Sequence, residues 1–104
     1  EMLSIRLQEP GVYAACDGEE VLGLCRFEAR EAVTVVRALE LRAPEDREML
    51  DGLLRAVLFH GLRLGRPSYR LEEGAAAPCR EALRALGIAE SGEVESLPRN
   101  CRED

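Results

Sequence analysis

The hydrophobic pattern of this 104-residue chain changes its period at Ala43-Pro44, and the change restricts the folds open to the chain. Ahead of that point the apolar residues are β-branched or alternate with polar ones, as they do in strands with one buried face. Beyond it they recur at intervals of three and four between Met49 and Leu62, which is typical of an amphipathic helix. The two halves together predict an α+β domain.

Two strands border the segment ahead of this change. Residues 2–7 alternate between apolar and polar side chains, which predicts a first strand, and Pro10-Gly11 ends it. Residues 32–41 are rich in valine and leucine, which predicts a fourth strand, and Pro44 cannot continue its hydrogen-bond ladder. The second and third strands are expected between them.

An Asp-Gly pair at positions 17 and 18 separates two apolar runs, 12–16 and 21–27, and predicts a β-hairpin. If Cys16 lies opposite Val21 across this turn, Cys16 and Cys25 share one face of the sheet. Their separation along the strands argues against a disulfide, because the Cα atoms of bridged cysteines lie within about 7 Å. We expect both to be small core residues.

The C-terminal half is expected to add strands and a helix in turn. Gly65 is predicted to cap the long helix, and residues 67–72 form a short strand. A second helix is predicted from Pro78 to Gly87, and residues 94–97 are expected to form a last edge strand.

This order of elements predicts a mixed, mostly antiparallel sheet of about five to six strands with two helices and one right-handed crossover. We assign residues 1–98 to a single domain and expect a flexible C-terminal tail at residues 99–104. With 46% hydrophobic residues, the domain can bury a core without help from metals or disulfides.

The charge and hydropathy of the chain limit the classes of partner that it can bind. A net charge of −6 argues against nucleic acid, because phosphate backbones are bound by clusters of Lys and Arg. The longest apolar run, residues 56–59, falls far short of the ~20 residues of a membrane-spanning helix, and no leader opens the sequence. We therefore expect a cytoplasmic protein with neither nucleic acid nor membrane as its partner.

The cysteines carry no metal-binding spacing. They are Cys16, Cys25, Cys79 and Cys101, with no C-x-x-C pair among them, and His60 is the single histidine. A zinc site would need ligands from four distant segments, so we expect no metal site. Free thiols in a reducing compartment are the favoured interpretation, with two disulfides as the alternative.

Residues 12–88 contain five predicted features in a fixed order. They are a hairpin with an Asp-Gly turn, a strand that ends at Pro44, a long helix, a further strand and a helix that closes on Leu86-Gly87. In this order the segment, about three quarters of the chain, resembles the GNAT superfamily of N-acetyltransferases. The resemblance implies an acyl-CoA, such as acetyl-CoA, as the cofactor. The family usually has two helices between its first strand and the hairpin, and Pro10-Gly11 leaves no room for them. Their absence would uncover one sheet face, which predicts a surface for a protein partner.

The family binds the pyrophosphate of its cofactor on an Arg/Gln-x-x-Gly-x-Gly/Ala turn that opens the long helix, where free amides and the helix dipole attract anions. The resemblance places this turn at Arg47-Glu48-Met49-Leu50-Asp51-Gly52. Arg47 and Gly52 match the pattern, whereas Leu50 replaces a glycine and is expected to crowd the approach to the backbone. Carboxylates at the same helix start would repel a pyrophosphate by about 1 kcal/mol per pair, and they belong to Glu45, Asp46, Glu48 and Asp51. We therefore predict a degenerate cofactor turn.

Catalytic residues are sparse. A general base in this family is often a carboxylate on the strand before the cofactor turn, and the resemblance assigns that position to Glu40, although strand glutamates are more often simply solvated. The family's later Asn and its proton-donating Tyr correspond to Ala76 and Leu83, and leucine has no proton to give. Cys79 lies one helical turn away, where packing is the commoner role, and His60 lies far along the long helix without a partner.

Two functions remain open on the sequence. The first is a non-catalytic, GNAT-like module for protein interaction or dimerisation, because an uncovered sheet face and free sheet edges invite contact. The alternative is a minimal acyl-CoA-dependent N-acyltransferase that acts on an unknown amine through Arg47, the amides of the helix start and Glu40. A third interpretation, an unrelated α+β domain, sets the family aside. Acetyl-CoA or another acyl-CoA is the candidate ligand of the enzyme alternative alone.

Overall fold

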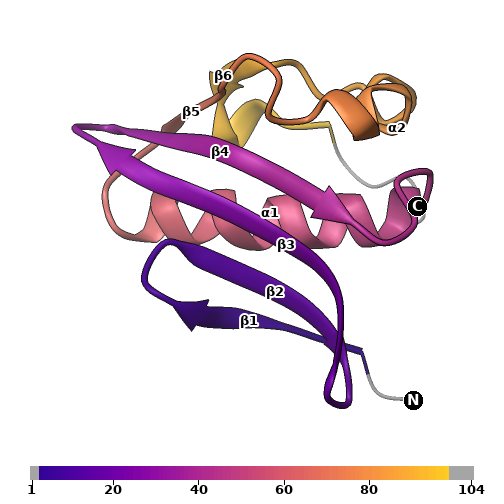
Figure 1. Cartoon of the computed structure of the whole chain (residues 1–104). Coiled ribbons are helices and arrows are strands. Elements are labelled where there is room, and N and C mark those ends of the chain that lie inside the picture. The colour runs from indigo at the N-terminus through magenta and orange to yellow at the C-terminus, as the bar shows by residue number, and fades with distance from the viewer. Residues whose placement is uncertain (1–2, 99–104) are drawn as a thin grey trace, which may run out of the picture.

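The first four strands are joined by tight turns and pair in chain order as an antiparallel meander (Figure 1). They are β1 (Leu3–Glu9), β2 (Val12–Asp17), β3 (Glu20–Arg30) and β4 (Val33–Leu41). The computed structural model describes residues 3–98 of the chain. The predicted strands and the hairpin at Asp17-Gly18 are confirmed, and only the Pro10-Gly11 turn lies between β1 and β2.

The rest of the chain adds two α-helices, two strands and two short 3-10 helices. These elements are α1 (Arg47–Arg63), β5 (Ser68–Leu71), η1 (Ala77–Cys79), α2 (Arg80–Leu86), β6 (Ser91–Glu93) and η2 (Val94–Ser96). Because α1 carries the chain back along the sheet, β5 pairs in parallel with β4, whereas β6 returns antiparallel to β5. The six strands lie in chain order, so the fold is the predicted α+β arrangement with a mixed, mostly antiparallel sheet.

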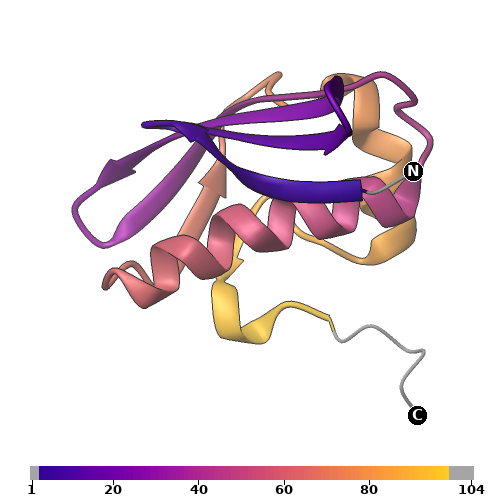
Figure 2. The same ribbon diagram turned by 90° about the horizontal axis from the view of Figure 1, so that it is seen from below.

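Helix α1 begins after Asp46, whose side chain accepts a hydrogen bond from the Met49 N–H at 3.1 Å and so caps the first turn. Helix α1 lies along one face of the sheet (Figure 2), and its buried residues recur at intervals of three and four. They are Leu50, Leu53, Leu54, Val57, Leu58 and Gly61. Leu64 caps the end of the helix, and Gly65 follows with φ of 93°, so the predicted glycine stop lies one residue beyond the observed cap.

Two glycines let α1 approach the sheet closely. A Cβ atom added to Gly61 would lie 2.2 Å from Thr34 Oγ1 on β4, and one added to Gly52 would lie 3.2 Å from Ile5 Cδ1 on β1. Thr34 is fully buried, and its hydroxyl oxygen accepts a hydrogen bond from Arg66 Nε at 3.2 Å. Packing against the sheet therefore requires glycine at position 61, whereas at position 52 the nearest atom is the movable end of a side chain.

The hairpin between β2 and β3 has the predicted Cys16–Val21 pair, but the remaining register differs from the expectation by one residue. Leu22 is an extra residue on β3, so Cys25 lies opposite Tyr13. Tyr13 and Cys25 therefore share the face that packs on α1, and Cys16 points to the other side of the sheet. The expectation that the two cysteines share a face is wrong, and both thiols are free and buried.

The end of α2 is confirmed in detail. Gly87 has φ of 74°, and its N–H donates to Arg84 O at 3.0 Å while the Ile88 N–H donates to Leu83 O at 3.1 Å. This is the Schellman arrangement that the Leu-Gly ending predicts, and Ile88 is buried beneath it.

The last strand lies earlier than predicted. Strand β6 covers Ser91–Glu93, whereas residues 94–96, which were expected to be extended, form η2. Val94 is fully buried and its N–H donates to Pro67 O at 2.8 Å, but Pro67 has no N–H to return the bond, so the ladder ends at this position. The predicted tail, residues 99–104, lies outside the described residues.

The face of the sheet opposite α1, which we call the open face, carries no helix within residues 3–98 (Figure 2). Helix α2 packs on α1 and η1 instead. Side chains of β3 and β4 that point away from α1 form the open face, and they include Leu24, Arg26, Glu28, Ala38 and Glu40. An uncovered face is the outcome expected from the short connection between β1 and β2.

Candidate functional site

The predicted cofactor turn, residues 47–52, lies within the first turns of α1 and is not a loop ahead of it. The Leu50 N–H donates to Asp46 O at 3.1 Å, so the amides from Leu50 onward are used by the helix itself. The Met49 N–H is bound by the Asp46 side chain. A diphosphate at this position would therefore find only the N–H groups of the first two helical residues free of helix bonds.

The side chains of this turn point in different directions around the helix. Leu50 is fully buried in the core, so the expectation that its side chain crowds the exposed backbone is wrong. Gly52 faces Ile5 on β1. The Asp51 carboxylate accepts a hydrogen bond from Arg55 Nε at 2.8 Å, one turn further along. The structure thus disperses the six predicted residues and does not gather them into one site.

Charge at the start of α1 is mainly negative. Arg47 is exposed and borders a hollow of about 320 Å³ between the two helices, with Glu45 and Glu81 also in its wall. Glu48 is exposed beside Arg47, and Asp46 is occupied as the helix cap. An anion in this hollow would gain one guanidinium and meet two carboxylates on the surrounding wall.

Glu40 lies on the open face, opposite Leu24 of β3, and its side chain is exposed. It borders a second hollow, of about 340 Å³, whose wall includes Glu73 and Pro78. Pro78 is also part of the wall of the Arg47 hollow, so the predicted base and the predicted anchor lie on either side of it. The structure places them near a common residue but in separate hollows.

In the second half of β4, the backbone groups that face β5 are already hydrogen-bonded to the loop that follows β5. The parallel pairing ends at Val36, and beyond it the Glu72 N–H donates to Val36 O at 2.9 Å. The Leu39 N–H then donates to Ala75 O at 3.1 Å. An extended ligand would need these same backbone groups to lie along β4, so the loop after β5 takes the place of a ligand strand.

No acid is available where the resemblance implies one. Ala76 and Leu83 are both buried in the core. Cys79 is buried as well, and burial raises the pKa of its thiol, which makes it a packing residue and a poor proton donor. Burial raises the pKa of Cys25 more strongly, to about 12.

His60 has an aromatic environment that sequence spacing did not indicate. Its ring lies 5.5 Å from the Tyr13 ring and 6.1 Å from the Phe27 ring, both edge-on. Desolvation by this packing lowers the pKa of His60, and the positive charges of Arg63 and Arg66 lower it further. The neutral imidazole therefore packs on the sheet, and no carboxylate contributes to its pKa shift.

We expect this packing to make folding sensitive to mild acid. Because the folded-state pKa of His60 lies below its unfolded value near 6.5, the unfolded chain takes up the proton first as the pH falls. The stability from neutral His60 is complete above that value and is lost as the pH falls through it. Urea denaturation at pH 7.5 and pH 5.5 measures the loss, and His60→Phe, which keeps an aromatic ring, should reduce it. An unchanged loss in His60→Phe would assign the sensitivity to carboxylates alone.

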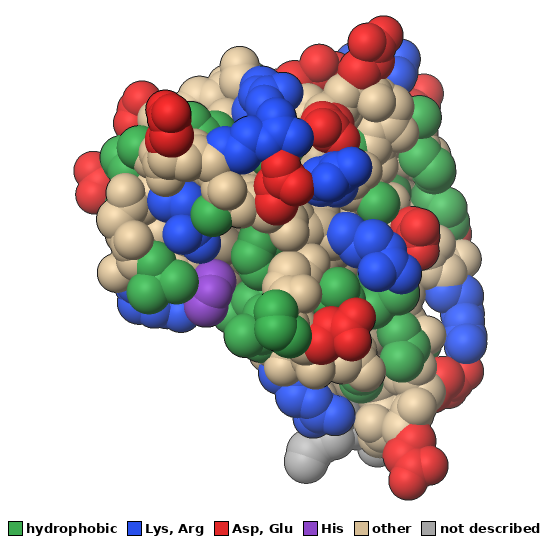
Figure 3. Space-filling model, turned by 60° about the vertical axis from the view of Figure 1, so that its left-hand side comes forward, with side chains coloured by type: hydrophobic (Ala, Val, Ile, Leu, Met, Phe, Trp, Pro, Cys, Tyr) green, Lys and Arg blue, Asp and Glu red, His purple; other side chains and the backbone are tan. Residues whose placement is uncertain are grey.

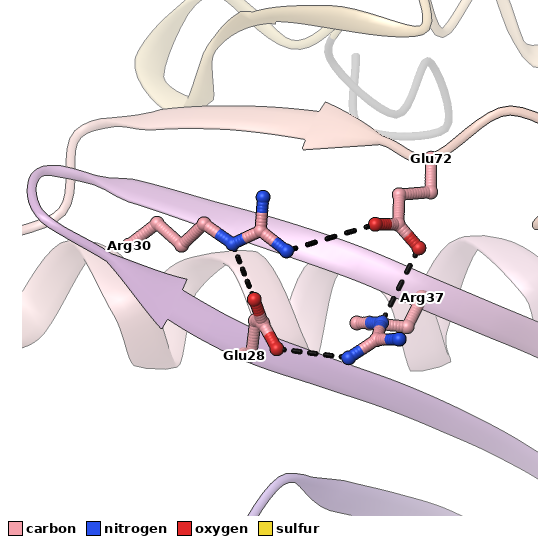
Figure 4. Close-up of polar contacts among 4 residues, drawn as sticks. All are labelled: Glu28, Arg30, Arg37 and Glu72. Carbon is pink, nitrogen blue, oxygen red and sulfur yellow. Dashed lines mark hydrogen bonds and ion pairs between the residues drawn. The ribbon is translucent and has the colours of Figure 1, made fainter.

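Four charged side chains form an alternating ring on the open face (Figure 4). Arg37 donates to Glu28 at 2.9 Å and to Glu72 at 3.2 Å, while Arg30 is paired with Glu28 and, at 3.8 Å, with Glu72. The hydrogen bond that Arg30 donates to Glu28 lowers the pKa of Glu28, and the hydrogen bond that Arg37 donates to Glu28 raises the pKa of Arg37. The ring joins β3, β4 and the end of β5, and the exposure of its members keeps each pair weak.

Sequence spacing signals only part of this ring. Glu28 and Arg30 are two apart on one strand, so their shared face can be predicted. Arg37 is the extra residue of a bulge on β4, and its position depends on that irregularity. On the molecular face shown in Figure 3, basic and acidic side chains are interspersed without a large patch of one sign.

A larger hollow, of about 670 Å³, lies between the end of β5 and α2. Its wall combines Glu72 and Glu90 with Arg80 and Arg84 above the buried Leu83. No motif in the sequence points to it, because its residues come from three segments of ordinary composition. Within residues 3–98 no group of His, Cys, Asp and Glu side chains is arranged to hold a metal ion.

Comparison with known proteins gives one kind of match. No family model matches the sequence, and no curated protein is similar to it. Among solved structures, a crystal structure of a mutant of TTHA1254 from Thermus thermophilus is similar, with a TM-score of 0.57 and 30% sequence identity. The similarity covers 79% of this chain and 65% of that protein, so the chain spans less than two thirds of its relative. None of the helices in the described part of the chain is long and apolar enough to cross a bilayer.

Proposed function

We propose that this chain is a non-catalytic, GNAT-like module that acts in the cytoplasm by binding a protein partner, either a different protein or a second copy of itself. The observation that carries the proposal is the state of the amides at the start of α1. Asp46 binds the Met49 N–H, and the helix uses the amides from Leu50 onward. A nucleotide thioester held by its diphosphate needs those groups free.

Four further features support the proposal. The Leu39 N–H on β4 is already bonded to Ala75 O, so the loop after β5 fills the path along that strand. The positions of the family's proton donor hold buried Leu83 and Ala76. Within residues 3–98 the open face carries charged side chains and no α-helix, which leaves it to a protein surface. Free, buried thiols at Cys16 and Cys25 fit a reducing compartment.

The alternative, a minimal N-acyltransferase, is favoured by one observation. Arg47 lies exposed beside a hollow of about 320 Å³, and Glu40 lies beyond Pro78 in the next hollow. A donor that bound through Arg47 could bring its thioester toward Glu40. The two hollows and the acids around Arg47 make this the weaker proposal.

The two functions differ in a titration with acetyl-CoA and free CoA, followed by thermal unfolding. We expect no change in the melting temperature at millimolar ligand. A ligand present at a hundred times its dissociation constant would add about 2.7 kcal/mol, which raises the melting temperature of a domain this size by roughly 10–20 °C.

Arg47→Ala supplies the diagnostic variant and Arg84→Ala the control, because both remove an exposed arginine from a helix. A rise in melting temperature that Arg47→Ala abolishes and Arg84→Ala preserves would overturn the non-catalytic proposal in favour of the acyltransferase. A rise in melting temperature that both substitutions reduce equally would indicate that the CoA phosphates are attracted weakly to any exposed arginine.

A further inference from the structure

The two edges of the sheet differ in how they are protected. Strand β6 is three residues long and carries Glu93, both of which discourage pairing with another strand. Strand β1 is seven residues long, contains no proline, and pairs with β2 alone within residues 3–98. Its outer backbone edge therefore offers a template for a further strand.

Strand β1 also exposes apolar side chains. Leu3 is 55% exposed and Leu7 is 45% exposed, and they flank the half-buried Ile5 on the face that carries α1. Ile5 contacts the helix at Gly52. The next helical positions on that side, Met49 and Ala56, lie three and four residues from Gly52 and are half-buried. Apolar surface thus continues from the strand edge onto the helix.

We propose that the partner of this edge is a second copy of the chain, which pairs its β1 antiparallel to the first with Ile5 opposite Ile5. The inference rests on the proposed function and names the partner. It follows from the pairs that this register creates: Leu3 of each copy lies opposite Leu7 of the other, and Ser4 lies opposite Arg6. Within residues 3–7 every apolar residue meets an apolar residue, and no like charges meet within these residues.

Other registers lose this match. Pairing centred on Arg6 sets the two Arg6 side chains opposite each other and places Leu3 against Glu9, so like charges meet and an exposed leucine meets a carboxylate. A shift by one residue places Ile5 opposite Arg6, which sets an apolar side chain against a charged one. Self-complementarity therefore selects a two-fold axis through the Ile5 pair.

The axis has a geometric consequence for the helices. Residues directly opposite each other in an antiparallel pair project on the same side, so both α1 helices lie on one face of a sheet that runs through both copies. The Met49 and Ala56 side of each helix then borders the paired strands. Contact at this helix surface extends the interface beyond the strand pair.

Disulfide trapping tests the register. In a Cys101→Ser background, Ile5→Cys places a thiol opposite its own copy, while Arg6→Cys places one on an exposed side chain opposite Ser4. Mild oxidation should cross-link Ile5→Cys at least about fivefold more than Arg6→Cys, because only the former pair lies within disulfide range. Random collision would favour the more exposed Arg6→Cys, so equal or reversed yields would overturn the proposal.

Substitutions that introduce a charge pair at Leu3 and Leu7 test the same register without changing Ile5, which also packs against the core. Leu3→Glu and Leu7→Lys should each weaken the dimer about tenfold or more in sedimentation equilibrium, because each sets a charge against leucine. The double variant should recover to within about threefold of the unsubstituted chain, since Glu and Lys then face each other twice. A double variant weaker than either single would overturn the register.

These outcomes are separable from the failure of the proposed function. A chain that remains monomeric at every concentration overturns the second-copy inference and leaves the acetyl-CoA titration unaffected. Binding of acetyl-CoA through Arg47 overturns the non-catalytic proposal, whereas the cross-linking and charge-pair results still decide whether β1 pairs with itself.

Discussion

Replacing Gly61 with alanine should lower the free energy of unfolding by about 2–3 kcal/mol, although the same change in a solvent-facing helix raises it by about 1 kcal/mol. The added Cβ would lie 2.2 Å from Thr34 Oγ1, and Thr34 is fully buried. Either α1 separates from β4 or the Thr34 side chain rotates away from Arg66, and both lose native contacts. Urea denaturation followed by circular dichroism measures the change.

Gly52→Ala is the matched control in the same helix. Its Cβ would lie 3.2 Å from the end of the Ile5 side chain, which can move, so we expect a change within about 0.5 kcal/mol or a small gain. Thr34→Ala removes the clashing oxygen, and combined with Gly61→Ala it should cost less than the sum of the two single changes. Equal losses for the two glycine substitutions, or strict additivity with Thr34→Ala, would contradict this explanation.

Leu50→Gly should destabilise the chain by about 4 kcal/mol, from the loss of a buried leucine and the lower helix propensity of glycine. Leu50 has no exposed surface and belongs to the main core cluster. The loss is a large part of the roughly 5–15 kcal/mol that typically stabilises a folded domain. This substitution also places glycine where the resemblance to the GNAT superfamily implies one, and it does so by removing part of the core. Thermal unfolding measures the effect.

Glu48→Gly provides the comparison, because it places glycine in the same turn at an exposed position and should cost only about 1 kcal/mol. Neither variant should bind acetyl-CoA, since both retain the Asp46 cap and the carboxylates of Glu45 and Asp51. A Leu50→Gly chain as stable as Glu48→Gly would show that Leu50 contributes little to the core. Binding of acetyl-CoA by Leu50→Gly alone would show that the leucine side chain is the obstacle.

Hydrophobic period and turn residues were sufficient to predict the order of the elements, from the Asp17-Gly18 hairpin to the Leu86-Gly87 helix end. Register was not predictable to the same degree. One extra residue, Leu22, moves every pair beyond it and sends Cys25 to the face opposite that of Cys16. Gly23, directly after Leu22, is the one signal in residues 21–25, because an isolated glycine within a strand often marks a bulge, but it does not say which residue is the extra one.

The candidate site shows a similar limit. The sequence identified Arg47 and the surrounding acids correctly as the start of a helix, but the direction of each side chain depends on the first helical residue. Because α1 begins at Arg47, Leu50 faces the core and the amides after it are bonded within the helix. Helix starts vary by one or two residues in prediction from sequence, and a shift of that size changes which amides are free. The loop after β5, which bonds to Leu39, could not be placed from sequence because its contact is long-range.

The strands follow one another across the sheet in the order in which they occur along the chain. Strands β1 to β4 need only adjacent segments to find each other, whereas β5 joins them after the whole of α1 has been traversed. The entropic cost of closing the loop that contains α1 therefore opposes the formation of the β5–β6 corner and not that of the first four strands. We therefore expect local unfolding to start at this corner, where it would release the amides of Leu71 and Val94 to hydrogen exchange while those of the four-strand meander stay protected.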